Sequence, residues 1–173
     1  MPFYPGLGVG GHCIAEDPLY LYWKAKKYGF NSKFIKLSSD LNHQMAAYVI
    51  HRVEDLLKAR KQSLAKALIL VVGVTYKKDV RDLRKSPPLR LLELLKSKYK
   101  VNYYDPFVEH LHIGGIKMDS VSLTPVELKK YSCVIIAVDH TNVNYKLIAR
   151  NAKLVFDVKN VYQGEKFTNV YLL

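Results

Sequence analysis

A cysteine lies in a glycine-rich stretch near the start of this 173-residue sequence. Five residues of Phe3–Cys13 are Gly or Pro, His12 directly precedes the thiol, and Asp17 follows four residues later. Glycines let a backbone approach a ligand closely, and a thiol beside an imidazole and a carboxylate has the surroundings of a covalent nucleophile. We therefore expect Cys13 to do chemistry; the alternative is an inert thiol in a tight turn.

A cationic segment follows the apolar run 67–74. Five basic residues precede a predicted helix start at Ser86-Pro87, namely Lys77, Lys78, Arg81, Arg84 and Lys85. The N–H groups and the dipole of a helix N-terminus favour anions, so this segment is a candidate diphosphate site. Because it contains only Gly73, it is neither the Gly-x-Gly-x-x-Gly dinucleotide loop nor a P-loop. The alternative is a solvated charged loop.

Acidic residues follow three later apolar runs, at Asp105-Pro106, Asp139-His140 and Asp157–Asn160. In an open parallel sheet the ligand lies beyond the carboxyl ends of the strands, so each of these sites can reach the same edge. No set of His, Cys, Asp and Glu residues has a recognised zinc spacing. We therefore expect no metal, and we expect His12 and His140 to be structural or merely adjacent to the site rather than metal ligands.

Strands and helices alternate from residue 67 onward. The predicted strands are 67–74, 100–104, 121–123, 133–138 and 153–157, with helices beginning at Ser86, Thr124 and Asn144. Apolar strands that alternate with helices predict an α/β fold with a Rossmann-like, doubly wound parallel sheet. Cys133 lies within one apolar run and is expected in the core.

The sequence before residue 61 is predicted to be a loop, 1–17, followed by helices. One helix is expected over 18–29, with Pro18 in its first turn, and a longer one over 40–60. Apolar residues of the longer helix recur every three or four positions and form one stripe: Leu41, Met45, Tyr48, Val49, Val53, Leu56 and Leu57. A stripe of this length needs cover, and we expect a second copy of the chain to contribute.

The composition is that of a soluble globular protein, with 49% hydrophobic and 24% charged residues. A net charge of +12 favours anionic partners. The basic residues are dispersed, however, and no helix carries a recognised base-reading motif, so nucleic acid is not expected. Two cysteines are too few for a disulfide scaffold, and no segment resembles a membrane span or a signal peptide. A cytoplasmic, reducing location is expected.

Two long motifs resemble the UDP-glucose/GDP-mannose dehydrogenase family. The first, Pro5-Gly6-x-Gly8-x-Gly10-Gly11-His12-Cys13-x-x-x-Asp17-Pro18, is similar to the active-site signature of nucleotide-sugar 6-dehydrogenases. The second, Gly73-Val74-x-Tyr76-Lys77-Lys78-Asp79-x-x-Asp82-x-Arg84-x-Ser86-Pro87, is similar to their UDP-binding loop. The sequences Phe3-Tyr4-Pro5 and His12-Cys13-Ile14 are most similar to those of members that oxidise UDP-N-acetylglucosamine or UDP-N-acetylmannosamine.

The resemblance implies a division of the chain into two parts. Residues 1–62 would form the active-site Cys loop and a helical dimerisation segment, with a homodimer through helix 40–60. Residues 63–173 would form a UDP-sugar-binding domain. The family's N-terminal NAD domain and its catalytic Lys and Asn have no counterpart here, so we expect the C-terminal portion of an NAD-dependent UDP-N-acetylhexosamine 6-dehydrogenase, inactive alone. The alternative is a non-catalytic UDP-sugar-binding or dimerisation module.

The implied reaction oxidises the C6 alcohol of the sugar twice, with two NAD, to a uronate. Cys13 would attack the intermediate aldehyde, loss of hydride would give a thioester, and Asp17 would act as a base or orient the hydrolytic water. The residues implied for substrate binding are Tyr4, Gly8, Gly10, Gly11, Lys77, Arg84 and Lys159.

Three positions depart from the family pattern. Leu7 replaces the usual Pro, Ala15-Glu16 replaces a Pro-apolar pair, and Lys159 replaces an Arg. Glu16 adds a negative charge near the thiol, and a Lys offers a point charge in place of the bidentate fork of Arg. These two changes are expected to affect efficiency rather than the class of reaction.

Overall fold

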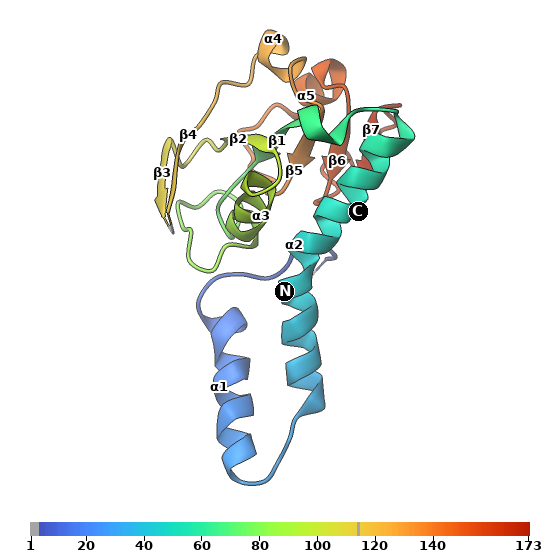
Figure 1. Cartoon of the computed structure of the whole chain (residues 1–173). Coiled ribbons are helices and arrows are strands. Elements are labelled where there is room, and N and C mark those ends of the chain that lie inside the picture. The colour runs from blue at the N-terminus through green and yellow to red at the C-terminus, as the bar shows by residue number, and fades with distance from the viewer. Residues whose placement is uncertain (1–3, 114) are drawn as a thin grey trace.

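The computed structural model describes residues 4–113 and 115–173, so Phe3 of the first motif lies outside the described residues. Two helices precede the sheet: α1, Cys13–Lys27, and α2, Lys33–Ala59. α1 and the first half of α2 lie side by side and project from the rest of the chain as a helical hairpin (Figure 1). We call residues 13–45 the arm.

Five strands form one parallel sheet in the order β2-β1-β5-β6-β7. Their bounds are β1 Leu68–Val72, β2 Lys100–Tyr104, β5 Cys133–Ile136, β6 Val155–Asp157 and β7 Val170–Leu172. The central strands are apolar along their whole length because helices cover both faces of the sheet. The predicted α/β fold with a doubly wound parallel sheet is confirmed.

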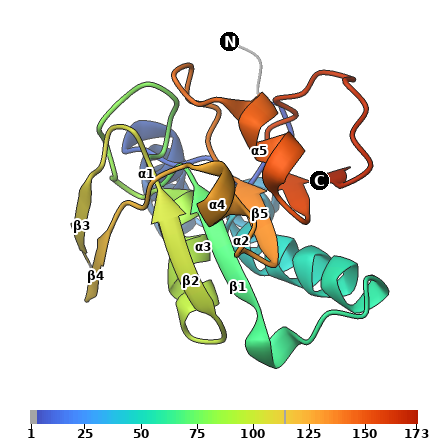
Figure 2. The ribbon, with the colours of Figure 1, turned by 90° about the horizontal axis from the view of Figure 1, so that it is seen from above.

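Successive side chains of the strands point into two different apolar cores. Ile69 and Val71 of β1 lie in the core completed by α2 and α3, Pro87–Lys96. Leu70 and Val72 lie in the core completed by α4, Pro125–Leu128, and α5, Tyr145–Asn151. In Figure 2, α4 and α5 lie in front of the strands, and α2 and α3 lie behind them.

Side-chain caps begin three helices where the sequence predicts them. Ser86 Oγ accepts a hydrogen bond from the Leu89 N–H, and Thr124 and Asn144 cap α4 and α5 in the same way. A proline directly follows Ser86 and Thr124, at a helical position that has no N–H bond to lose. The cap at Ser86 places the end of the cationic segment at the start of α3.

Both helices of the arm begin earlier than predicted. α1 starts at Cys13 rather than at residue 18, because the Glu16 N–H donates to the His12 carbonyl at 3.2 Å and closes a turn before Pro18. α2 starts at Lys33 rather than at residue 40, since residues 33–39 contain no Gly or Pro that would stop a helix. Cys13 therefore lies in the first turn of a helix and not in a loop.

Some short elements also differ from the prediction. A hairpin of β3, His110–Ile113, and β4, Ile116–Asp119, was not predicted, although Gly-Gly between alternating side chains is typical of a hairpin. The strand predicted over 121–123 is wrong, because this segment contributes only a hydrogen bond from the Val121 N–H to the Tyr103 carbonyl. β7 was missed because three residues give no readable pattern.

α2 is buried along its second half and exposed along its first. The same core as β1 and α3 contains five of its residues: Ala46, Val49, Ile50, Val53 and Leu57. Leu41 and Tyr48 of the predicted stripe remain about half exposed. The chain itself therefore covers one end of the stripe, and only the other end is left for a partner. The domain boundary near residue 62 stays a prediction.

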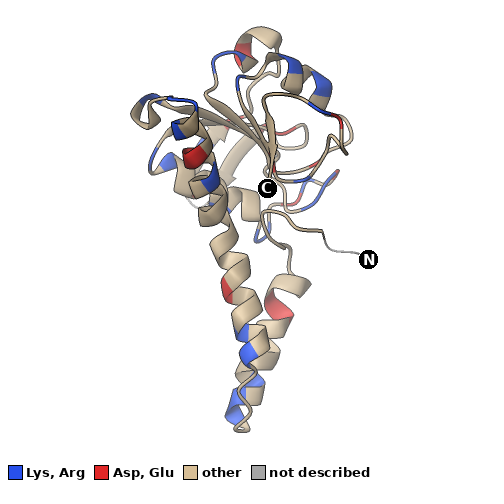
Figure 3. Cartoon of the chain, turned by 90° about the vertical axis from the view of Figure 1, so that its right-hand side faces the viewer, with Lys and Arg blue, Asp and Glu red and all other residues tan. Residues whose placement is uncertain are grey.

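The tip of the arm combines basic and large apolar side chains. Residues 20–37 contain Lys24, Lys26, Lys27, Lys33 and Lys36 and no Asp or Glu, and Figure 3 shows basic residues gathered there. The large apolar residues exposed beside them are Tyr20, Leu21, Trp23, Tyr28, Phe30, Phe34 and Leu37. Within residues 4–113 and 115–173, no helix has the length and apolar character needed to cross a membrane.

Candidate active site

The chain leaves the middle of the sheet in two directions. β1 leads through residues 73–86 to α3 and β2 on one side, and β5 leads through residues 137–144 to α5 and β6 on the other. Open α/β sheets bind ligands at such a reversal, beyond the carboxyl ends of the strands. The cationic segment lies at this edge, and we call residues 75–85 the cationic loop.

The glycine-rich segment before α1 runs across the same edge of the sheet. A Cβ on Gly6 would lie 3.7 Å from the carbonyl oxygen of Val158, which directly follows β6. Asn42 of α2 holds Val9 through both backbone groups, at 2.7 Å to the N–H and 2.9 Å to the carbonyl. The Gly11 N–H donates to the Arg84 carbonyl at 3.1 Å. The fold thus joins the two motifs directly.

Gly10 and Gly11 are needed because the cationic loop lies directly against them. A Cβ on Gly10 would lie 2.4 Å from the Lys85 carbonyl oxygen and 2.7 Å from Pro87 Cδ. At Gly11, where φ is 84°, a Cβ would lie 2.9 Å from the Tyr76 ring. These glycines therefore let two segments of the protein pack together. Contacts of Gly8, Gly10 and Gly11 with a sugar stay a prediction.

Cys13 is exposed in the first turn of α1, where the helix dipole favours a negative charge. The pKa of the Arg84 guanidinium is raised, mainly by its hydrogen bonds with Asp82, with smaller electrostatic contributions from Tyr76 and Cys13. The Gly11 N–H, two residues before Cys13, donates to the Arg84 carbonyl, so the thiol and the cationic loop lie close together. This neighbourhood follows from the fold, since the two residues are far apart in the sequence.

The two carboxylates that follow Cys13 face different surroundings. Asp17 lies one helical turn after Cys13, on the same side of α1, and is exposed. Glu16 forms an ion pair with Lys85 at 3.1 Å, so the negative charge that departs from the family pattern is balanced by the cationic loop. Tyr4 is exposed and lies at the far end of the glycine-rich segment.

The remaining predicted cations lie along the carboxyl edge. Asp139, after β5, pairs with Lys159 at 3.6 Å and with Lys78 at 4.0 Å, and Lys77 is exposed on the same loop. The Lys159 N–H donates to Asp157 at 2.9 Å. Burial raises the pKa of Asp157, although hydrogen bonds from the backbone after β6 oppose this effect. The structure thus brings Lys159 beside the cationic loop.

A buried polar cluster connects the start of the cationic loop to the residues that follow β2 and β5. Thr75, Asp105 and His140 are buried and hydrogen-bonded, and Asp79 of the loop contacts His140. Asp105 and His140 were expected at the same edge of the sheet, but their contact with each other was not predicted. The sequence signal for both is a polar residue within a few positions of the end of an apolar strand.

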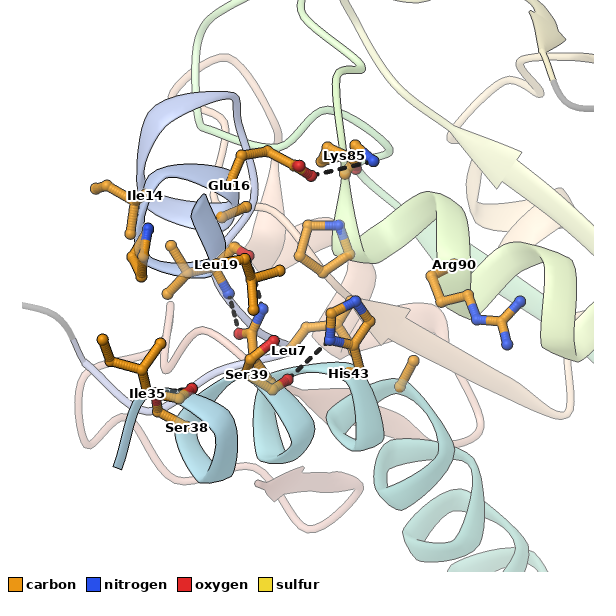
Figure 4. A pocket seen from close by; sticks show the side chains of 17 residues that line it. Leu7, Ile14, Glu16, Leu19, Ile35, Ser38, Ser39, His43, Lys85 and Arg90 are labelled. Carbon is orange, nitrogen blue, oxygen red and sulfur yellow. Dashed lines mark hydrogen bonds and ion pairs between the residues drawn. The ribbon is translucent and has the colours of Figure 1, made fainter. Parts of the chain in front are cut away.

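A pocket of about 470 Å³ lies between α1, α2 and the start of α3 (Figure 4). Ile14, Leu19 and Ile35 line it, and the Glu16–Lys85 pair borders it. Cys13 and Asp17 do not line this pocket because they occupy the other side of α1. The pocket is therefore not the place of the expected chemistry.

The first βα junction does not fit a nicotinamide dinucleotide. Its one glycine, Gly73, lies so close to Val138 that a Cβ would come within 2.4 Å of the Val138 Cβ. The N-terminus of α3 begins with two prolines and its Leu89 N–H donates to Ser86, so the free N–H groups expected there for a diphosphate are not available, and only the cations of the loop remain to bind one. No group of His, Cys, Asp and Glu that could hold a metal occurs within the described part of the chain.

Comparison with known proteins identifies the family. The UDP binding domain of the UDP-glucose/GDP-mannose dehydrogenase family matches residues 70–164, and the central domain of that family matches residues 1–44. The chain belongs to this family, which confirms the resemblance seen in the two motifs.

The chain is similar to enzymes of UDP-N-acetylhexosamines. It is 31% identical over 176 residues to the UDP-N-acetyl-D-glucosamine 6-dehydrogenase of Pseudomonas aeruginosa, covering 96% of this chain and 40% of that protein. It is 32% identical over 170 residues to the UDP-N-acetyl-D-mannosamine dehydrogenase of Methanococcus maripaludis, covering 92% and 36%. The chain therefore spans well under half the length of these relatives.

Solved structures agree with the fold. The UDP-D-ManNAc dehydrogenase from Pyrococcus horikoshii aligns over 98% of this chain and 39% of its own, with a TM-score of 0.80 at 27% identity. The UDP-N-acetyl-mannosamine dehydrogenase Cap5O from Staphylococcus aureus aligns over 98% and 37%, with a TM-score of 0.70 at 34% identity.

Proposed function

We propose that this chain is the substrate-binding and thiol-bearing portion of an NAD-dependent UDP-N-acetylhexosamine 6-dehydrogenase. The observation that carries the proposal is the hydrogen bond from the Gly11 N–H to the Arg84 carbonyl at 3.1 Å. It places the thiol of Cys13 beside a loop whose charge suits a diphosphate. A nucleotide sugar spans these two features, with its diphosphate on the loop and its sugar toward the thiol.

The cationic loop and Lys159 would hold the UDP part. Asp82 accepts from the Arg84 side chain at Nε and at Nη2, which orients the guanidinium. An oriented guanidinium loses little freedom when it binds an anion, and its remaining N–H groups suit phosphate oxygens. Lys77 and Lys78 add point charges next to it. Tyr4, exposed before the glycine-rich segment, would contact the substrate as the family resemblance implies.

Cys13 would supply the nucleophile for the second oxidation. Its thiolate would add to the C6 aldehyde and give a thiohemiacetal, and water would later hydrolyse the thioester to the carboxylate. Asp17, one turn along α1, would accept a proton from that water or orient it. Glu16 would take no part, because its carboxylate is paired with Lys85.

The hydride acceptor would be NAD, which oxidises the alcohol and the thiohemiacetal when it is bound. The first βα junction of this chain does not fit a dinucleotide, so residues other than those of this chain would bind NAD. We therefore expect the 173-residue chain alone to bind UDP-sugar and to give no turnover with NAD.

The arm would form a homodimer with the arm of a second copy. Its support is the row of exposed apolar residues on the first half of α2, which continues the stripe buried in the second half. Neighbouring exposed apolar side chains that form a patch are typical of interaction surfaces. Sedimentation is expected to show a dimer, and Leu41→Asp is expected to give a monomer.

Protection of Cys13 from alkylation tests whether thiol and nucleotide share one site. Saturating UDP-N-acetylglucosamine is expected to slow alkylation of Cys13 about tenfold or more, because the sugar would cover the exposed thiol. Arg84→Ala is expected to abolish protection at the same ligand concentration. Arg52→Ala, on the exposed side of α2, is the matched control and should keep it. Alkylation at an unchanged rate in the wild type would reject the shared site.

A non-catalytic UDP-sugar-binding or dimerisation module is the second candidate. No structural feature favours it over the enzyme, since Cys13 and Asp17 lie together on one side of α1. Slow alkylation of Cys13 without ligand would support it.

A further inference from the structure

The cationic loop is tied to the residues that follow β5. The Asp79 N–H donates to Nδ1 of His140 at 3.0 Å. The Asp79 carboxylate accepts from the Thr141 N–H at 2.8 Å and from its hydroxyl at 3.0 Å. Asp79 has a φ of 57°, in the left-handed region that residues other than Gly rarely adopt. These hydrogen bonds hold a turn that the backbone alone would disfavour.

The neighbours of His140 determine where its hydrogen lies. A backbone amide can only donate, so Nδ1 must be an unprotonated acceptor. Nε2 therefore carries the hydrogen, and it faces Asp105 Oδ2 at 3.2 Å and Thr75 Oγ1 at 3.3 Å. The Thr75 hydroxyl already donates to the Lys77 carbonyl at 2.8 Å, which leaves a lone pair for the imidazole. All these contacts agree with the neutral Nε2–H tautomer.

Asp105 is the hydrogen-bond acceptor that fixes this cluster to the ends of the strands. It accepts from the Val74 N–H at 2.7 Å and from the Phe107 N–H at 2.8 Å. Burial acts to raise the pKa of Asp105, but hydrogen bonds from His140 and from these two amides outweigh it, so the pKa lies below its usual value. An ionised carboxylate thus connects the ends of β1 and β2 to the imidazole.

We propose that His140 is a positioning residue for the diphosphate of the nucleotide sugar. It does not contact the ligand. It holds residues 75–79 in one conformation through its hydrogen bonds with Thr75 and Asp79. The Tyr76 N–H donates to the Asp82 carbonyl at 3.0 Å, and the Asp82 carboxylate orients Arg84. His140 therefore acts on Lys77 through Thr75 and on Arg84 through this closure. The proposal rests on the proposed function of the loop.

The physical reason is the charge of the loop. The loop carries five cations and two carboxylates, Asp79 and Asp82, so the excess of like charge would spread an unanchored loop over many conformations before an anion binds. Ordering these residues on binding would then reduce the affinity. His140 anchors the loop without adding a sixth positive charge, because its tautomer is neutral.

Two substitutions separate positioning from packing. His140→Leu fills similar space without an acceptor and is expected to weaken UDP binding about tenfold or more. His140→Asn places an amide oxygen near the position of Nδ1 and is expected to bind UDP within about threefold of wild type. His112→Leu, an exposed histidine on β3, is the matched control and should bind like wild type. Equal UDP affinity of His140→Leu and wild type would overturn the proposal.

Nitrogen NMR of the wild-type chain tests the anchor without a variant or a ligand. The expected spectrum shows His140 as the neutral Nε2–H tautomer, with a scalar coupling between Nδ1 and the Asp79 amide nitrogen and slow exchange of that amide. A protonated Nδ1, or fast exchange of the Asp79 amide, would overturn the proposal even if His140→Leu failed to fold. Absence of UDP binding by wild type would instead reject the proposed function of the loop.

Discussion

The carboxyl edge of the sheet buries polar side chains, whereas the arm exposes apolar ones. Thr75, Asp105 and His140 are buried at the edge, and within the described residues no buried side-chain nitrogen or oxygen lacks a hydrogen-bond partner. On the arm, Phe34 is 80% exposed and Trp23 58%. The edge is therefore complete within one chain, while the arm presents surface that burial against a partner would stabilise.

The carboxyl edge and the arm contribute to function in different ways. A buried polar cluster costs free energy unless each group is paired, so its presence indicates that a fixed loop geometry is needed. Exposed apolar side chains cost free energy in water, by about 25 cal/mol per Å² relative to burial. The edge therefore prepares a binding site in advance, and the arm prepares an interface.

The two cysteines give the largest expected contrast. Burial raises the pKa of the Cys133 thiol to about 12, so at pH 8 only about one molecule in ten thousand carries its thiolate. Cys13 is exposed on the arm. We expect Cys13 to react with a disulfide reagent at least ~10³-fold faster than Cys133. Cys13→Ser should remove the fast phase, and two fast phases in the wild type would contradict the burial of Cys133.

Leu57→Ala is expected to destabilise the chain strongly. Leu57 is fully buried between α2 and the sheet, so its loss should reduce the free energy of unfolding by about 2–5 kcal/mol. Leu41→Ala, on the exposed half of the same helix, is the matched control and should change it by less than about 0.5 kcal/mol. Urea unfolding measures both at a protein concentration at which the wild type is a monomer, so that the proposed dimer does not add to the effect of Leu41→Ala. Equal changes in the free energy of unfolding would contradict the conclusion that the second half of α2 is buried and the first half exposed.

Gly10→Ala is expected to separate the two motifs. A Cβ there would meet the Lys85 carbonyl oxygen at 2.4 Å, so the segments must move apart at a cost of about 1–3 kcal/mol. Proteolysis should cleave the glycine-rich segment faster in this variant than in wild type. Gly6→Ala, whose Cβ would have no neighbour nearer than 3.7 Å, should be cleaved like wild type. An unchanged rate in Gly10→Ala would contradict the close packing.

Tyr99→Phe is expected to give the smallest effect, about 1 kcal/mol at pH 7. The Tyr99 hydroxyl donates to Glu54 at 2.6 Å and is the main cause of the lowered pKa of Glu54. Burial, together with Glu54, raises the pKa of Tyr99 to about 12.

The sign of the pH dependence follows from these two shifts. The Glu54 contribution is present above about pH 4.5 and is lost as the pH falls through the lowered pKa. The Tyr99 contribution is present below pH 10 and is lost as the pH rises toward 12. Unfolding of Tyr99→Phe should therefore depend less on pH in both ranges, and Tyr28→Phe, on the exposed tip, should behave like wild type.

The sheet could be predicted because its signals are local. The apolar run at 67–74 and the Ser-Pro cap at Ser86 each specify an element through neighbouring residues. The start of α1 could not, since Pro18 suits a first turn and only the Glu16 N–H to His12 carbonyl bond shows an earlier one. The hairpin β3–β4 had a readable signal in the Gly-Gly sequence between its strands.

The candidate site was only partly predictable. Cys13, Asp17 and the cations were found by residue type and spacing, which single out exposed reactive groups. The anchor of the cationic loop was missed because Asp79, Asp105 and His140 are distant in the sequence and meet only when β1, β2 and β5 pair. The packing of Gly10 and Gly11 against the protein's own loop was not predicted, and their contact with a sugar stays a prediction.

Calorimetric titration of the 173-residue chain with UDP-N-acetylglucosamine, UDP and NAD tests the central claim most directly. We predict that UDP and the UDP-sugar bind, that Arg84→Ala weakens both, and that NAD gives no heat of binding. Binding of NAD with no binding of UDP would contradict the assignment of the carboxyl edge to the nucleotide sugar.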